Sequence, residues 1–121
     1  MELNEYQERA MTTCMPSSHN FSYMFLNLVG EVGEFASKVA KFIRKDKAGI
    51  EYDTLMMCGC HTDDVEELKK EAGDILWQLS GLCTVMDWSL EEIAQQNLDK
   101  LAARKAAGTI DGSGDGIIRG K

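Results

Sequence analysis

The sequence predicts an all-α, bundle-like fold of four helices, and three observations support that prediction. Only one proline, Pro16, interrupts 121 residues, so long segments are free to be helical. Apolar residues recur at spacings of three and four over several turns, the period of a helix with one buried face. Alternation of period two never extends beyond a few residues, and no Asn-Gly or Asp-Gly pair joins two apolar runs. Strands are therefore not expected.

The first two helices are placed by their ends and their apolar faces. The first is expected to begin near Asn4, with Gln7 as its capping-box partner, and to end at Pro16. The second is expected over about residues 23–44, and residues 45–62 then form a charged, glycine-containing connection. The apolar stripe of the second helix consists of Leu28, Val32, Phe35, Val39 and Phe42.

Two further helices follow the connection. The third is expected to begin at Asp63 with Glu66 as capping-box partner, and the fourth is capped by Ser89 with Glu92 in the matching position. A glycine-rich tail, about residues 108–121, is expected to be loose on its own. The inward positions of these two helices are Leu68, Ile75, Leu79, Leu82 and Met86, and then Leu90, Ile93, Ala94, Leu98 and Leu101.

Length and composition favour one globular domain over residues 1–121, because 44% of the residues are hydrophobic. No run of about 18 apolar residues is present, so no membrane span is expected. The acidic N-terminal segment lacks the layout of a secretory signal, which favours a cytoplasmic location. The net charge of −7 repels a nucleic-acid backbone, so polymeric DNA or RNA is not an expected partner.

Two acidic pairs are the strongest functional signal. Glu31 and Glu34 lie three apart in the second helix, and Glu71 and Asp74 lie three apart in the third. This spacing places both members of a pair on one helix face, next to the apolar stripe. Packing of the two stripes would therefore bring four carboxylates to one edge of the bundle. The alternative for any single pair is an ordinary solvated helix face.

Four neighbouring carboxylates repel one another unless a cation lies between them. Oxygen ligands suit Mg²⁺, with Mn²⁺ as a substitute, and Mg²⁺ commonly bridges carboxylates to substrate phosphates. Such a cation also activates water for phosphoanhydride hydrolysis. Gly33 and Gly73, inside the two motifs, lower helix propensity and are expected to make room for a neighbouring helix or for ligand.

Five other side chains are candidate substrate contacts. Lys38 continues the acidic face of the second helix and suits a phosphate, although an ion pair within the helix is the alternative. Asn97, Lys100 and Arg104 lie on one face of the fourth helix and suit a sugar or base together with phosphates. Trp77, beside the second acidic motif, either lines a base pocket or packs in the core.

A cysteine-histidine cluster has a weaker functional interpretation. Cys58, Cys60 and His61 form a Cys-Gly-Cys-His run, but zinc sites usually space their thiols two to four residues apart and add a second pair. A loop that contains cysteines is the favoured interpretation.

These residues together resemble the MazG-like family of all-α nucleoside triphosphate pyrophosphohydrolases, whose superfamily includes dimeric dUTPases and dCTP pyrophosphatases. The resembling stretches are residues 26–45, 67–82 and 89–120, more than half of the chain. The resemblance implies hydrolysis of an NTP or dNTP between the α and β phosphates, which releases pyrophosphate. It also implies a homodimer or homotetramer in which the site is completed across subunits.

The resemblance implies roles residue by residue. The four motif carboxylates match metal ligands, and one or more of them, with Glu34, Glu71 and Asp74 as the catalytic candidates, orient the attacking water. In the tail, Asp115 and Arg119 resemble a terminal Gly-Asp-x-Arg motif whose spacing is stretched here. Three alternatives stay open: a pyrimidine-specific dUTPase- or dCTPase-like enzyme, a non-catalytic helical metal- or nucleotide-binding module, and a bundle with incidental acidic pairs.

Overall fold

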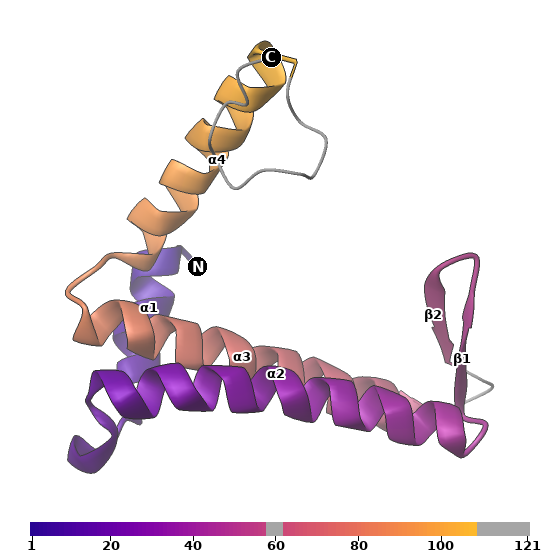
Figure 1. Cartoon of the computed structure of the whole chain (residues 1–121). Coiled ribbons are helices and arrows are strands. Elements are labelled where there is room, and N and C mark those ends of the chain that lie inside the picture. The colour runs from indigo at the N-terminus through magenta and orange to yellow at the C-terminus, as the bar shows by residue number, and fades with distance from the viewer. Residues whose placement is uncertain (58–61, 109–121) are drawn as a thin grey trace.

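Four α-helices make up most of the described chain, as the sequence predicts. The structure is a computed structural model, and it describes residues 1–57 and 62–108. A short 3₁₀ turn and one two-stranded hairpin accompany the helices (Figure 1). In chain order the elements are α1 (Leu3–Met11), the 3₁₀ turn (Pro16–Ser18), α2 (Phe21–Arg44), β1 (Ala48–Glu51), β2 (Thr54–Met57), α3 (Thr62–Val85) and α4 (Leu90–Ala106).

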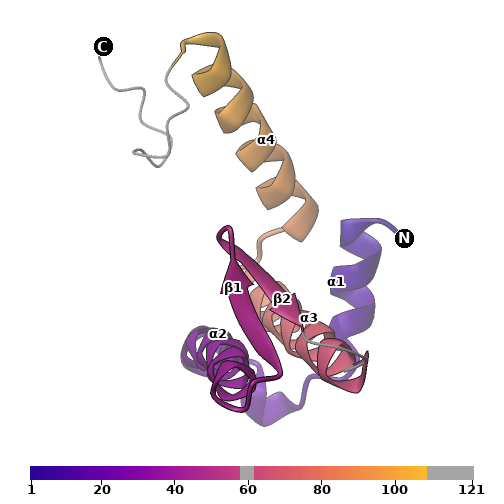
Figure 2. The same cartoon turned by 90° about the vertical axis from the view of Figure 1, so that its right-hand side faces the viewer.

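The two long helices, α2 and α3, lie antiparallel and side by side along their length (Figures 1 and 2). Their packing at the hairpin end forms a small core in which Phe42, Ala48 and Leu68 are buried. Half-buried side chains from α2 and β2 surround these three: Phe35, Val39, Leu55 and Met57. Three residues of the apolar stripe predicted for the second helix, Phe35, Val39 and Phe42, therefore supply this core. Leu28 is half-buried outside it, and Val32 is half exposed.

At the other end of the pair, α2 and α3 approach through a glycine. Met24 of α2 is fully buried, and its side chain occupies the space in which a Cβ on Gly81 would stand. We expected Gly33 and Gly73 to give this kind of room. A Cβ at either position would meet no atom of the described chain within 4 Å. The close helix approach is thus at Gly81, and any space at the other two glycines faces outward.

The connection between α2 and α3 is partly a β-hairpin, which contradicts the prediction that this segment has no strands. β1 and β2 pair antiparallel, with Glu51 opposite Thr54. The two residues of the turn, Tyr52 and Asp53, have φ values of 50° and 61°. A two-residue turn with both φ values positive matches the right-handed twist of the strands. The turn has the sequence Tyr-Asp, so the Asn-Gly and Asp-Gly signals of a hairpin do not predict it.

Several predicted helix ends shift by a few residues. Asn20 caps α2, because its side chain accepts a hydrogen bond from the Tyr23 amide at 2.8 Å, so α2 begins earlier than predicted. The first helix ends at Met11, and Pro16 instead opens the 3₁₀ turn. Ser89 caps α4 as predicted, through the Glu92 amide at 3.2 Å.

Gln7 does not form the predicted capping box; it joins α1 to the turn between α3 and α4. Its amide nitrogen donates to Thr84 Oγ1 at 3.0 Å and to the Trp88 carbonyl at 2.9 Å. Its amide oxygen accepts from the Leu90 amide at 2.7 Å, at the first residue of α4. The Gln7 side chain therefore helps to fasten the start of α4 to α1.

We expect the Gln7→Leu substitution to lower the free energy of unfolding by about 1–3 kcal/mol, because it leaves the Leu90 amide and the Thr84 hydroxyl without this partner. Urea denaturation followed by circular dichroism measures the change. Gln96→Leu, at an exposed glutamine of α4, is the control and should change stability by less than about 0.5 kcal/mol. Equal stabilities of the two variants would show that Gln7 does not fasten α4.

The last helix does not close a four-helix bundle with the others. It projects away from the α2–α3 pair and packs on α1 near its start (Figures 1 and 2). Leu98 and Leu101, predicted to face inward, are 60% and 37% exposed. Within the described chain, this half of α4 has an apolar face without a core to cover it.

Among the described residues, no helix combines the length and hydropathy that crossing a membrane requires.

Candidate functional site

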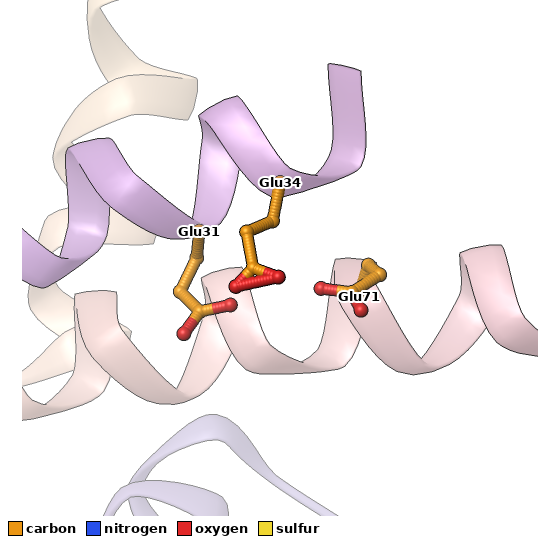
Figure 3. Close-up of side chains that lie close together, drawn as sticks. All are labelled: Glu31, Glu34 and Glu71. Atoms are coloured by element: carbon orange, nitrogen blue, oxygen red, sulfur yellow. The ribbon is translucent and has the colours of Figure 1, made fainter. Parts of the chain in front are cut away.

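The acidic pairs of α2 and α3 face each other across the helix pair. Glu31 and Glu34 extend from α2 toward α3, and Glu71 of α3 points back toward them (Figure 3). One carboxylate oxygen from each of the three lies within 4.8 Å of the others. As predicted, the spacing of three places Glu31 and Glu34 on one face of α2, and that face is directed toward α3.

Asp74, the fourth predicted carboxylate, lies outside this group of three. It is exposed, one turn after Glu71 on α3. Its charge nevertheless acts on the group, because it contributes to the raised pKa of Glu31. The structure thus brings three of the predicted carboxylates together and keeps the fourth within electrostatic reach.

The cluster has the features of a cation site. Burial is the first cause that raises the pKa of Glu31, and the charges of Asp74, Glu34 and Glu71 add to it. Glu71 is nearly buried, with 14% of its side chain exposed, and its Oε1 atom has no hydrogen-bond partner in the described structure. A buried carboxylate oxygen without a partner is unfavourable, and a divalent cation between the three groups would satisfy it. The donor set, all carboxylate oxygen, fits Mg²⁺ or Mn²⁺.

Lys38 lies at the edge of the cluster and pairs with α3. Its Nζ atom is 3.3 Å from Glu67 Oε1 and 3.6 Å from Glu71 Oε2. The hydrogen bond to Glu67 is the main cause that raises the pKa of Lys38. The sequence pattern predicts a phosphate contact or an ion pair within α2 for Lys38, whereas the observed pairs reach across to α3, where Glu67 was not among the predicted site residues. The ammonium group of Lys38 still lies close enough to the cluster to bind a phosphate oxygen there.

Trp77 joins α3 to α1. Its indole N–H donates to the Ala10 carbonyl at 3.0 Å and to Thr13 Oγ1 at 3.1 Å, and the side chain is half buried. Both hydrogen bonds support the structural interpretation of this residue. A contact between its ring and a nucleobase remains a prediction.

The α4 candidates lie away from the carboxylates. Asn97 and Lys100 line a shallow hollow of about 250 Å³ with Ile93 and Gln96, whereas Arg104 is buried. Because α4 projects from the α2–α3 pair, the described chain does not bring these side chains to the acidic cluster (Figure 1). Their predicted substrate contacts need another arrangement of chains. The remaining sequence candidates, Cys58, Cys60, His61, Asp115 and Arg119, lie outside the described residues.

The raised pKa of Glu31 leads to a pH prediction. The folded protein binds a proton at Glu31 more tightly than the unfolded chain, so this stability is present below the unfolded pKa and is lost as pH rises through the raised pKa. Near pH 7 we therefore expect metal-free Glu31→Gln to be more stable than the metal-free wild type. The advantage should vanish as the pH falls to about 4, where the wild-type carboxyl is protonated.

Thermal unfolding in EDTA across this pH range measures both proteins. Glu2→Gln, at an exposed residue before α1, is the control and should track the wild type. A stability difference between wild type and Glu31→Gln that does not change with pH would contradict the assigned electrostatics.

Comparison with known proteins identifies the class to which this fold and site belong. The family model of the MazG nucleotide pyrophosphohydrolase domain matches residues 19–108, which contain α2, α3, α4 and all four motif carboxylates. The chain therefore belongs to the MazG nucleotide pyrophosphohydrolase family. It is also 35% identical over 122 residues to the Gene 37 protein of Mycobacterium phage L5, across 95% of this chain and 98% of that protein. No solved structure matches the chain.

Proposed function

We propose that the protein is a metal-dependent nucleoside triphosphate pyrophosphohydrolase that cleaves an NTP or dNTP into the monophosphate and pyrophosphate. The observation that carries the proposal is the group formed by Glu31, Glu34 and Glu71, in which one buried oxygen has no hydrogen-bond partner among the described residues. It lies within the part of the chain that matches the pyrophosphohydrolase family. The family membership supplies the reaction class, and the cluster supplies a place for the cation.

The three carboxylates would hold Mg²⁺, or Mn²⁺ in its place, and Asp74 would complete the set or orient water. When bound, the cation draws charge from the phosphates and lowers the pKa of water. Lys38, whose Nζ atom is 3.6 Å from Glu71 Oε2, would bind a phosphate oxygen beside the cluster. Ionised carboxylates accept hydrogen bonds and donate none, so they suit the orientation of a nucleophilic water, and they would repel a phosphate unless a cation lay between.

The active form would be a homodimer or homotetramer. An apolar surface on α2 supports this assembly, because five large side chains on it are 44–65% exposed: Phe21, Phe25, Leu26, Val29 and Val32. The exposed face of α4, with Leu98 and Leu101, adds to it. Apolar patches of this kind typically mark protein interfaces. In such an assembly α4 of one subunit would bring Asn97 and Lys100 toward the acidic cluster of another, whereas Arg104 is buried within its own subunit.

The first experiment is a panel of the eight common NTPs and dNTPs with Mg²⁺, in which pyrophosphate is measured separately from orthophosphate. We expect pyrophosphate release from one or a few of them. Selective turnover of dUTP or dCTP would assign the pyrimidine-specific alternative. No release from any nucleotide, with Mn²⁺ also present, would contradict the proposed reaction and favour a binding module. Sedimentation equilibrium on the same samples gives the subunit number, and a monomer would refute the assembly.

A further inference from the structure

A second hollow lies on the side of α1, next to the helix pair that carries the carboxylates. It has a volume of about 560 Å³ and is lined by Met1, Tyr6, Arg9, Ala10 and Thr12. The volume is within the range of small-molecule sites.

A hydrogen bond links the lining of the hollow to α3, the helix that carries Glu71. The Ala10 carbonyl, in the lining, accepts the hydrogen bond from the Trp77 indole at 3.0 Å. Trp77 follows Asp74 by three residues on α3, and Tyr6 precedes Ala10 by four on α1, so the same faces of the two helices meet here. The charge of Asp74 raises the pKa of both Tyr6 and Glu31, after burial in each case. The charge of Asp74 therefore acts both on a residue that lines the hollow and on a residue of the cluster.

The lining suits a nucleoside. The Tyr6 ring, the Met1 side chain and the Ala10 methyl group offer apolar surface, and aromatic rings stack on nucleobases of any kind. Arg9 adds a planar guanidinium, which stacks on a base or binds a sugar or phosphate oxygen. Its ion pair with Glu5, at 3.3 Å, is exposed on both sides, with 70% of the Arg9 side chain in contact with solvent. Such a pair is weak, so Arg9 can turn toward a ligand.

We propose that the hollow on α1 receives the nucleoside part of the substrate, with the base against Tyr6 and with Arg9 at its rim. The inference rests on the proposed function, in which the carboxylates and their cation hold the phosphates. The nucleotide would then lie across Asp74, with its triphosphate over the α2–α3 pair and its base on α1. Tyr6 and Arg9 are contacts to the nucleoside and not to the phosphates.

Titration calorimetry with Mg²⁺ tests this division of the site with two probes. One probe is the set of α,β-imido nucleoside triphosphates with the four RNA bases, and the other is inorganic triphosphate, which has no nucleoside. We expect Tyr6→Ala to weaken binding of the best analogue by about tenfold, the size of one lost stacking contact. Binding of inorganic triphosphate should stay within about twofold, since its partners are elsewhere. Tyr6→Phe should keep most of the analogue affinity because it keeps the ring.

Two control variants match these substitutions. Tyr52→Ala removes a tyrosine that is 99% exposed at the hairpin turn. Arg44→Gln matches Arg9→Gln, because both arginines lie in the last turn of a helix. We expect the controls to bind both probes as the wild type does, and Arg9→Gln to weaken only the analogue, by about threefold to tenfold.

Unchanged analogue affinity in Tyr6→Ala would overturn the inference, as would an equal loss for both probes, which would show that Tyr6 only supports the cation site. Failure of the wild type to bind any analogue would overturn it as well. Failure of the proposed function has a different readout, namely no pyrophosphate from any nucleotide in the panel.

Discussion

Replacing Glu71 with glutamine is expected to lower kcat for pyrophosphate release by on the order of 100-fold or more. The substitution removes the carboxylate whose buried Oε1 atom has no partner among the described residues, while it preserves the shape of the side chain. A bound divalent cation supplies several kcal/mol of charge stabilisation in the transition state, and each 1.4 kcal/mol corresponds to about a tenfold change in rate. Glu34→Gln should behave in the same way.

The measurement is steady-state hydrolysis of the nucleotide that the panel selects, together with far-ultraviolet circular dichroism to verify the helices. Glu66→Gln is the control, because this glutamate lies on the same helix in an exposed pair with Lys69 at 3.2 Å. It should retain kcat within about twofold, as expected for an exposed ion pair. Near-full activity in both Glu71→Gln and Glu34→Gln would refute the assigned site.

Valine at position 81 is expected to destabilise the fold by about 1–3 kcal/mol, the usual range for an overfilled core. The physical reason is Met24, which is fully buried and already occupies the space that the new Cβ would need. Either the methionine leaves its position or α2 and α3 separate. The melting temperature should fall by about 4 °C or more for each kcal/mol lost.

Gly30→Val is the matched control, since a Cβ there meets nothing within 4 Å in the described chain. Valine has a higher helix propensity than glycine, so this variant should be at least as stable as the wild type. Met24→Ala combined with Gly81→Val should be more stable than the sum of the two single changes predicts, because both act on one space. Additive effects would show that the two residues do not touch.

The sequence predicted the helices well because their signals are local. The cap at Ser89 and the stripe on α2 depend on residues within a few positions of one another; the cap is confirmed, and so is the part of the stripe from Phe35 to Phe42. Gln7 shows the opposite case. A glutamine three residues after an asparagine is a capping pattern, but its partners are 77 to 83 positions away. Such long-range hydrogen bonds cannot be predicted from spacing along the chain.

The prediction of the candidate site likewise succeeded where it depended on spacing within a helix. It missed the contacts that depend on how two helices pack. Spacing of three within α2, with the packing of apolar stripes, predicted the approach of Glu31 and Glu34 to Glu71, whereas Asp74 lies outside the group of three. It could not show that Lys38 pairs with Glu67, or that Tyr6 lies near Asp74, because both depend on how two helices are aligned. The sequence also did not show that α4 projects away from the other helices. Its apolar residues follow the spacing of a helix that packs one face against a core.

The crowding of three carboxylates has a consequence for protein engineering. Without a cation, the ionised form of Glu31 destabilises the folded protein. We therefore expect Glu31→Gln to raise the free energy of unfolding while it removes a proposed metal ligand. Directed evolution that selects only for heat resistance would therefore enrich substitutions at Glu31, and the selected variants would lose catalytic activity. Selection in the presence of Mg²⁺, with turnover as the score, would reverse that bias because the ion stabilises only proteins that still bind it.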